Sequence, residues 1–491
     1  MSVSSQRDQA AFWPILAAIC FGSFLATMGI SAVNVAIPSL MSDFGADLSH
    51  VKWAVTGFIL AGGVIAPVTG YLGDRLSPKY LYIVSLIGFT IASALCAMAW
   101  NVGALVAFRI LQGAFSGMIM PATMTIIYQV IPRERQPFAN SMWSLSSVLA
   151  PALGPTLAGW LIQTWSWHWL FWLNLPFGVV GVLVAMKLLP YYRLYSPKPF
   201  DLPGFVMVTS CSTAFLIAFS EVDQWGWTSW KTLGLLALGA VVLAAFIRRA
   251  RRVEAPLLQL QVFANRRFTL TLILGSIILI SLYSGSYLTP VFLQTIQQAG
   301  AMEAGLTLLP GSAAMAVFMP IAGRLYSKVG PAALITAGIL LIGAGMIAMG
   351  QLTPDISRTY IMGWMTVRNI GIALATMPAA NAGMEEIEAE LTGHASSASN
   401  WVKQGFGSLS IGLITSLLSL SVAMHTKELA GGGTVTGAVE RQAFTDAVND
   451  VTLLAAATAF LCLPLVWTLR RRKAQSGSVG NPAGRKAFSA E

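Results

Sequence analysis

Charged side chains are rare inside the long apolar segments of this sequence, and those that occur there are basic. Arg109 is the one charge in residues 104–127, and Gln112 follows it by about one helical turn, on the same face. Arg368 and Lys403 stand in two further apolar segments. Because a charge is costly to bury in a membrane, such residues commonly bind a charged or polar group. Arg109 can serve a cavity or only a structural pairing, and the other two can line a cavity or extend to the membrane surface.

Glycine and charge are combined in a second segment, Gly70-Tyr-Leu-Gly73-Asp74-Arg75-Leu-Ser-Pro-Lys79. The glycines permit close packing and a sharp turn at a helix end. The charged side chains can form a cluster at the face of a membrane. Such a cluster can hold one helix bundle against another in one conformation and release it in the next. The alternative is an ordinary basic turn that anchors the topology of the chain.

A shortened form of this segment occurs twice. The first copy is Pro67-x-x-Gly70-x-Leu72-x-x-Arg75, and the second, 253 residues later, is Pro320-x-x-Gly323-x-Leu325-x-x-Lys328. Each copy ends a long apolar run, which predicts a membrane protein made of two related halves. That architecture is typical of secondary transporters, whereas a receptor or scaffold needs no pseudo-symmetric cavity.

Proline and glycine gather in a third segment, where Pro151, Gly154, Pro155 and Gly159 fall within one apolar run. Proline removes a backbone hydrogen bond, and glycine lets a neighbouring helix approach closely. The segment is therefore a candidate bending point for a conformational change, and a simple kink is the alternative.

Composition identifies the elements that must position these groups as membrane helices. Of the 491 residues, 55% are hydrophobic and 10% are charged, against about a quarter charged in soluble domains. About 20 apolar residues are needed for a helix to cross a bilayer, and the alternation expected of barrel strands is missing. The sequence predicts an all-α integral membrane protein with fourteen spanning helices, near 12–40, 51–72, 79–99, 102–130, 137–164, 168–189, 203–221, 229–247, 268–295, 303–326, 330–350, 357–379, 395–424 and 451–469.

The basic residues predict the orientation of these helices. The net charge of +10 could indicate nucleic acid, but the Lys and Arg lie in short turns between apolar segments, so we expect no such partner. With the N-terminus inside, cytoplasmic segments hold 22 of the 30 Lys and Arg, and outer segments hold five. Positive charge favours the cytoplasmic side, so both termini are expected there.

The two copies of the repeat also predict the division of the chain, because they end the second and the tenth predicted helices. Two additional helices must therefore lie between two six-helix halves. Residues 427–450, with three consecutive glycines, are expected to form a flexible external loop, and the acidic run 385–390 a solvated cytoplasmic surface. The expected parts are a cytoplasmic N-terminus over 1–11, a six-helix bundle over 12–190, a linker with two extra helices over 191–267, a second bundle over 268–470 and a cytoplasmic, disordered tail over 471–491.

Several function classes lack their signatures. No Gly-x-x-x-x-Gly-Lys-Ser/Thr loop for ATP is present, which disfavours an ATP-driven pump. The four histidines have no metal-ligand spacing, and the four cysteines lie inside apolar runs without paired spacing. We therefore expect no enzyme, no cofactor and no metal site.

Together these motifs resemble the major facilitator superfamily and, within it, the fourteen-helix drug:proton antiporters of the EmrB/QacA type. The resemblance covers about residues 12 to 470. Gly70 to Lys79 is similar to the family's loop motif after helix 2, and Arg109-Ile-Leu-Gln112-Gly113 is similar to its helix 4 motif. Further matches are Asn34-Val-Ala-Ile-Pro38 in helix 1, Gly154-Pro155 with Gly159 in helix 5, Trp167 to Gly178 in helix 6, and Ala304 to Pro310 in helix 10.

The resemblance implies a multidrug exporter of small amphipathic molecules in a bacterial-type cytoplasmic (inner) membrane, which uses the proton gradient by alternating access. It implies an amphipathic substrate, protons and membrane lipids as partners, and some members of the family work with a periplasmic adaptor protein. The alternative is a dedicated exporter of one endogenous anionic or neutral metabolite or lipid.

One departure from the family pattern concerns charge. Many members carry an aspartate in helix 1, five residues before the Asn34 position, and Gly29 stands there in this sequence. None of the 20 acidic residues falls in the middle of a predicted helix. Acidic residues in spanning helices are the usual proton carriers and cation partners, so proton coupling and cationic substrates both come into question.

Overall fold

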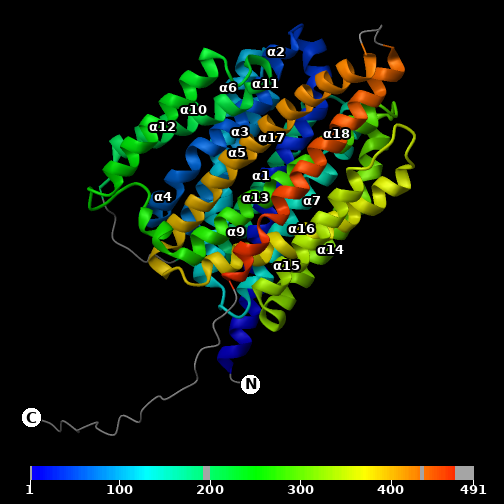
Figure 1. Cartoon of the computed structure of the whole chain (residues 1–491). Helices are drawn as coiled ribbons and strands as arrows, with labels where there is room; N and C mark the ends of the chain where they lie inside the picture. The colour runs from blue at the N-terminus through cyan, green and yellow to red at the C-terminus, as the bar shows by residue number, and fades with distance from the viewer. Residues whose placement is uncertain (1–2, 192–198, 432–435, 470–491) are drawn as a thin grey trace, which may run out of the picture.

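The computed structural model of the chain describes residues 3–191, 199–431 and 436–469, and the regular secondary structure in these ranges is helical. Figure 1 shows long helices that run side by side through one elongated body, with the N-terminus at one end. The long helices are α1 (Val3–Phe44), α3 (Trp53–Ile65), α5 (Pro78–Ala97), α6 (Val102–Val130), α7 (Gln136–Thr164), α9 (Asn174–Leu188), α10 (Leu202–Ser220), α12 (Trp230–Ala250), α13 (Arg266–Thr295), α14 (Ala301–Val329), α15 (Pro331–Met349), α16 (Arg358–Met384), α17 (Thr392–Ala430) and α18 (Gly437–Phe460). Shorter segments are α2 (Leu48–Val51), η1 (Ala66–Val68), α4 (Thr69–Leu76), α8 (Trp169–Trp172), α11 (Val222–Trp225), η2 (Leu260–Ala264), η3 (Ala389–Leu391) and α19 (Leu463–Trp467).

The repeat in the sequence is also a repeat in the backbone. α14 ends at Gly330, whose φ of 85° favours glycine, and α15 begins at Pro331. At the corresponding place in the first copy, Ser77 has a φ of 77° and Pro78 begins α5. Because serine rarely adopts a positive φ, the shared geometry indicates that both copies need the same sharp turn.

The hydrophobic core is divided between the two parts of the chain. Two clusters of buried side chains draw only on residues 12–189, and three draw only on residues 274–469. A further cluster joins these parts and includes side chains of α4, α6, α10, α12, α13 and α17. α10 packs against both α3 and α17, and α12 lies outside α10 at the edge of the molecule (Figure 1).

Within the described residues, twelve helices are long and apolar enough to cross a membrane, which confirms a multi-pass membrane protein. α7 and α16 stand outside this set, although they contain 29 and 27 residues. In α7 the side chains of residues 148–153 and 155–156 are not described, and α16 contains Arg368, Asn369 and Asn381. The predicted count of fourteen is therefore not confirmed.

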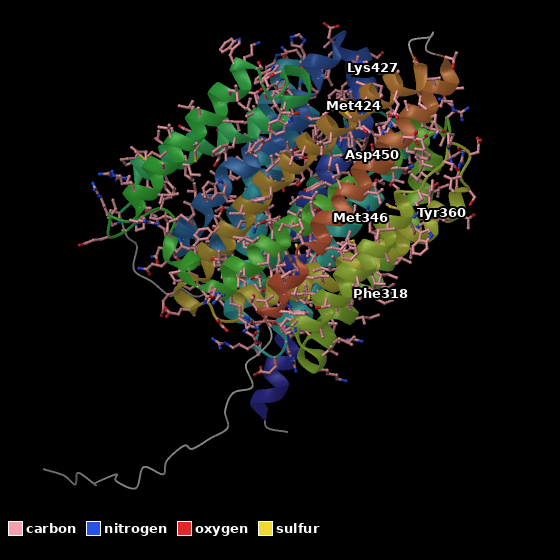
Figure 2. All side chains as sticks on the ribbon, viewed as in Figure 1. Phe318, Met346, Tyr360, Met424, Lys427 and Asp450 are labelled. Atoms are coloured by element: carbon pink, nitrogen blue, oxygen red, sulfur yellow. The ribbon has the colours of Figure 1, made fainter. Side chains whose placement is uncertain are left out.

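The prediction of a flexible loop over residues 427–450 was wrong for residues 427–430 and 437–450, which are helical, and residues 432–435 lie outside the described residues. α17 continues to Ala430, and α18 begins at Gly437, where the Thr436 side chain accepts a hydrogen bond from the Val439 N–H. Figure 2 shows Lys427 and Asp450 on these two neighbouring helices. The expected disordered tail 471–491 lies outside the described residues. The last turn of α17 and the first turns of α18 are rich in polar residues, so a search for apolar runs ended α17 too early and began α18 too late.

The second predicted helix is built from α3, η1 and α4 rather than from one regular helix. The break falls at Pro67, which lacks a backbone N–H and lies in the 3₁₀ turn. The turn delivers Gly70 and Asp74, on α4, to the end of the molecule that contains the start of α1 (Figure 1).

Candidate functional site

Arg109 is completely buried, and its N–H groups donate hydrogen bonds to two backbone carbonyl oxygens and one side-chain amide oxygen. Its Nη1 donates to Gln112 Oε1 at 2.6 Å, its Nε donates to the Ala54 carbonyl at 2.8 Å, and its Nη2 reaches the Gly29 carbonyl at 3.4 Å. The side chain therefore links α6 to α3 and α1. The predicted proximity of Arg109 and Gln112 corresponds to a direct hydrogen bond.

The guanidinium of Arg109 has no carboxylate partner among the described residues. The Phe58 ring lies 4.0 Å from its Cζ atom, and the Phe171 ring lies 5.9 Å away. Cation–π contacts of this kind contribute about 2 kcal/mol when desolvated, and they stabilise the charge without cancelling it. A Cβ built at Gly29 would lie 3.8 Å from Arg109 Nη1, so a carboxylate at that position would reach the guanidinium. The glycine leaves the positive charge uncompensated.

Glycines in α6 allow the backbone of α3 to come close enough for these contacts. A Cβ at Gly113 would overlap the carbonyl oxygen of Phe58, and a Cβ at Gly117 would overlap that of Gly62. Larger side chains at either position would separate the two helices and lengthen the bond from Arg109 to α3.

Arg368 is the counterpart of Arg109 on α16 and is 2% exposed. Its Nε and Nη2 donate to Asn369 Oδ1 at 3.2 and 2.9 Å. A side chain at Gly285 of α13 would overlap its Nη1, so a glycine again makes room for a buried arginine. Within the described residues Arg368 has no ion pair. Of the two alternatives for this residue, the structure shows burial and not extension to the membrane surface.

The side chains of Lys403 and Asn34 are not held by polar contacts in the described part of the chain. Lys403 is half-buried on α17 and has no polar partner among the described residues. It precedes Gly407 by one turn, and Gly407 faces the Tyr283 ring of α13, so Lys403 lies toward α13. Asn34 is exposed on α1 and forms no hydrogen bond within the described part of the chain.

Asp74 joins the first part of the chain to the second. Its Oδ2 lies 3.3 Å from His394 Nε2 of α17, and the other ring nitrogen of His394 accepts the Gln259 N–H at 3.4 Å. The latter bond implies that Nε2 carries the proton and donates to the carboxylate. Asp74 also lies at the N-terminus of α17, where a negative charge is stabilised by about 0.3–1 kcal/mol. Gly70 permits this approach, because a Cβ there would lie 3.1 Å from the Gly393 carbonyl and His394.

Of the three charged residues of the expected cluster, Lys79 binds backbone carbonyls of another helix. Lys79 Nζ donates to the carbonyls of Met186 and Leu189, at 2.8 and 2.6 Å, at the C-terminal end of α9. Arg75 donates to the Tyr71 hydroxyl at 3.1 Å. The carbonyls at a helix end compete for the lysine, and sequence spacing gives no sign of that partner. A Cβ at Gly73 would lie 3.7 Å from a methyl carbon of Leu81, so this glycine is in ordinary packing contact.

The second copy of the repeat makes the reciprocal contact. A Cβ at Gly323 of α14 would lie 2.9 Å from the Pro137 carbonyl and would crowd Ser141, near the start of α7. Arg324 lies over the Phe138 ring at 5.2 Å. Each copy thus packs against the first turns of a helix from the other part of the chain.

Four side chains without a recognisable motif strengthen the same junction. Asn381 Oδ1 accepts from the Tyr128 hydroxyl at 2.9 Å and from Asn140 Nδ2 at 2.8 Å. Gln129 donates to the Ala389 carbonyl at 3.1 Å. The contacts of Tyr128 and Asn140 with Asn381, of Gln129 with Ala389 and of Asp74 with His394 join residues 3–190 to residues 266–469, and these four contacts lie at this end of the molecule. These contacts therefore close the structure at the end that contains the start of α1, which we call the bonded end.

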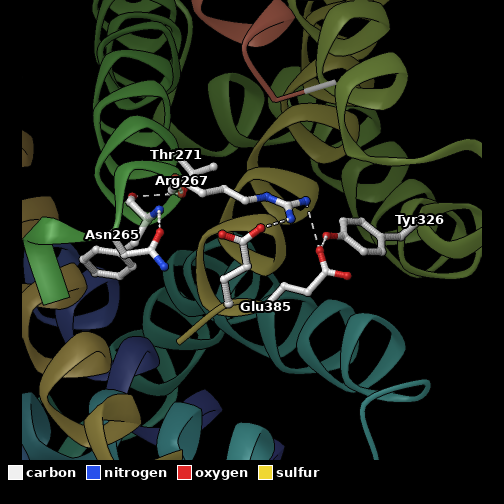
Figure 3. A network of polar contacts seen from close by, with 7 residues as sticks. Asn265, Arg267, Thr271, Tyr326 and Glu385 are labelled. Atoms are coloured by element: carbon white, nitrogen blue, oxygen red, sulfur yellow. Dashed lines mark hydrogen bonds and ion pairs between the residues drawn. The ribbon is translucent and has the colours of Figure 1, made fainter. Parts of the chain in front are cut away.

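The acidic run after α16 is not simply a solvated surface, as the sequence suggested. Figure 3 shows the side chain of Arg267, at the start of α13, close to Glu385 and Tyr326. Arg267 lies 3.0 Å from Glu385 and 2.8 Å from Glu386, and the Tyr326 hydroxyl contacts Glu385 at 3.2 Å. The network ties α13, α14 and the α16–α17 connection together.

The proline-glycine segment lies within α7, which is helical from Gln136 to Thr164. Gly154 is buried, and a Cβ at Gly159 would meet open space. The side chains of Pro151 and Pro155 lie outside the described residues. Bending at this segment stays a prediction.

Loss of the Asp74 carboxylate should open the bonded end. We expect Asp74→Asn to lengthen the distance between spin labels at Arg133→Cys and Glu390→Cys, in a background with the four native cysteines replaced. The double variant Asp74→Asn/His394→Leu should open no further than either single variant, because both remove one contact. Asp47→Asn, an exposed acid in the loop after α1, is the control. An unchanged distance distribution in Asp74→Asn would show that the contact does not hold this end closed.

Comparison with known proteins places this geometry in a family. The model of the Major Facilitator Superfamily matches residues 19–412. The uncharacterized MFS-type transporter YhcA of Bacillus subtilis is 30% identical over 453 residues, which are 92% of this chain and 85% of YhcA. The multidrug transporter protein MdtP of Bacillus subtilis is 28% identical over 420 residues, 85% of this chain and 77% of MdtP. The tetracenomycin C resistance and export protein of Streptomyces glaucescens is 28% identical over 411 residues, 84% of this chain and 76% of that protein.

Solved structures support the fold. The human organic anion transporter MFSD10 superposes with a TM-score of 0.66 at 12% identity, over 92% of this chain and 99% of that chain. With the motif pair, the two buried arginines and the family match in agreement, this chain belongs to the major facilitator superfamily of membrane transporters.

Proposed function

We propose that the chain exports small amphipathic molecules by proton-driven alternating access and prefers neutral or anionic compounds over permanent cations. The observation that carries the preference is the pair of buried arginines, Arg109 and Arg368, without carboxylate partners among the described residues. In a low-dielectric interior, an uncompensated positive charge repels a second one by several kcal/mol.

The distribution of buried carboxylates supports the positive charge that we propose for the interior. The buried carboxylates of the described part are Asp201 and Glu221, at the two ends of α10. Asp201 pairs with Arg249 at 2.8 Å, and Glu221 pairs with Lys52 at 2.9 Å. Neither is free to balance the arginines of α6 and α16. The same charge would suit the alternative, a dedicated exporter of one anionic or neutral metabolite or lipid.

Export is supported by the relatives and by motif. The tetracenomycin C protein and MdtP match more than four fifths of this chain. Gly154, Pro155 and Gly159 resemble the helix 5 motif associated with exporters. A periplasmic adaptor protein is a further candidate partner by resemblance alone.

Because Gly29 stands where many family members carry the helix 1 aspartate, proton coupling must use other groups. The contact of Asp74 with His394 is the first candidate, because it links the two parts of the chain through a carboxylate and an imidazole. Glu221 is a second candidate, since protonation would release Lys52. Asp223, the other histidines and competition at a basic residue complete the set of candidates.

We further propose fourteen spanning helices in a bacterial inner membrane, with α7 and α16 added to the twelve and both termini in the cytoplasm. At about 1.5 Å per residue, helices of 29 and 27 residues exceed the roughly 30 Å of a hydrocarbon core. The proposed units are the bundles 12–190 and 268–470 with the linker 191–267. In this orientation, the bonded end faces the cytoplasm.

Reporter fusions test the topology. Fusions after Lys198 and after Arg267 should both report a cytoplasmic location, because α10 and α12 cross and return. A fusion after Trp227 should report the outer side. Opposite locations for the first two would show that α10 and α12 do not form a spanning pair.

Arg109→Ala should reduce transport to background, because the charge, two interhelical hydrogen bonds and the bond to Gln112 are lost together. Arg109→Lys retains charge but not the forked geometry, so we expect a loss of about tenfold or more. Arg358→Ala, an exposed residue at the start of α16, should transport normally. Transport in proteoliposomes with matched protein content is the measurement, and full activity in Arg109→Ala would refute a role for the residue.

Flux in proteoliposomes with an imposed pH gradient tests the proposed function. An anionic amphiphile should be exported in the wild-type protein, and a quaternary ammonium compound of similar size should not. A protonophore should abolish the flux. Robust proton-driven export of the quaternary cation without export of the anion would contradict the proposal, and a screen in a host without efflux pumps would separate a broad from a dedicated exporter.

A further inference from the structure

A large cavity lies away from the two buried arginines, between the extra helices and α17. Its volume is about 1190 Å³, and its walls come from α10, α12, residues 251–264 and α17. Drug-sized sites usually measure about 300–1,000 Å³, so this cavity accepts a larger ligand. Its wall is rich in aromatic side chains: Phe215, Phe219, Phe246, Phe263, Trp401 and Phe406.

The cavity reaches the outer surface of the chain, where its lining residue Phe406 of α17 is exposed. α12 forms its outer wall, and Leu233, Leu238 and Val241 of that helix are exposed on the surface of the chain. Figure 1 shows α12 at the edge of the molecule. On the inner side, Trp401 is fixed by a 2.7 Å hydrogen bond from its Nε1 to Ser212 Oγ. A ligand would therefore enter from the membrane.

The mouth of the cavity is basic. Arg251 lines the cavity, and Arg248 and Arg252 lie close to it in the chain at the end of α12. None of these three has an ion pair among the described residues, whereas Arg249 is paired with Asp201. Glu254 also lines the cavity and balances Arg251, so the excess of positive charge near the mouth comes from the neighbouring Arg248 and Arg252. Basic groups at the cytoplasmic end of membrane helices attract anionic lipid headgroups.

We propose that this cavity binds an anionic phospholipid, with the acyl chains between α10, α12 and α17 and the phosphate at Arg251 and Arg252. The two-chain volume, the aromatic wall, the opening to the bilayer and the basic mouth all fit that ligand. The placement of the headgroup in the cytoplasmic leaflet rests on the proposed orientation. Because α17 also carries His394 and Lys403, the lipid would contact the helix that closes the molecule.

The test measures lipid retention by the purified full-length protein. The protein is equilibrated in nanodiscs containing equal amounts of phosphatidylglycerol and phosphatidylcholine, extracted, and analysed by native mass spectrometry. Wild-type protein should retain phosphatidylglycerol preferentially. Arg251→Gln/Arg252→Gln should lower this preference roughly 10- to 30-fold. Arg133→Gln/Lys328→Gln, which removes two exposed charges at the same end, should leave it unchanged.

A second pair of variants tests the acyl-chain site. A Cβ at Gly405 or at Gly234 meets no atom within 4 Å, but only Gly405 lines the cavity. Gly405→Trp should therefore release the lipid, and Gly234→Trp should retain it. Equal retention in these two variants would overturn the proposal.

If Gly405→Trp fails to fold, a measurement on the cavity without that substitution still tests the proposal. Brominated phosphatidylglycerol should quench tryptophan fluorescence more in the wild-type protein than in Trp401→Phe. Equal quenching in the two proteins would show that no lipid occupies the cavity. Displacement of the lipid by a lipophilic anionic dye at stoichiometric concentration would instead assign the cavity to the exported compound. These readouts need neither flux nor a pH gradient, so they stay valid if the transport proposal fails.

Discussion

The burial of a guanidinium group without a carboxylate is the constraint on which the rest of the structure depends. Removing such a charge from water costs several kcal/mol, so every available oxygen and ring must compensate. For Arg109 these are the carbonyls of Ala54 and Gly29, the amide of Gln112 and the Phe58 ring. They can surround it only because glycines in α6 bring α3 within backbone contact. The interior keeps a net positive charge, and the proposed substrate preference follows from it.

The repeated segment supplies the second level of organisation. Gly70 seats α4 against the first turn of α17, and Gly323 seats α14 against the first turns of α7. Asp74 adds a charged contact to one of these junctions, whereas the second copy has Arg324 over an aromatic ring. The two junctions share a geometry but differ in chemistry. Among the contacts described here at the two junctions, a carboxylate meets a histidine at the Asp74 junction alone.

Sequence reasoning identified features that depend on local spacing. α6 was predicted with its observed bounds, Arg109 and Gln112 were predicted to meet, and the repeat was predicted to mark a special helix end. Features that depend on tertiary neighbours were missed. Asn381 contacts Tyr128 and Asn140 across more than 240 positions, and no motif marks any of the three. The extensions of α17 and α18 were missed because their outer turns are polar.

The central claim is that Gly29 leaves Arg109 uncompensated and thereby sets the preference for charge. Gly29→Asp places a carboxylate within reach of the guanidinium, and Gly275→Asp, also at an open helical position, is the control. The most direct measurement is the ratio of equilibrium affinities of the purified protein for an anionic and a quaternary cationic amphiphile of equal size. We predict that Gly29→Asp shifts this ratio toward the cation by about tenfold or more, the equivalent of about 1.4 kcal/mol, whereas Gly275→Asp does not. An unchanged ratio in Gly29→Asp would contradict the account.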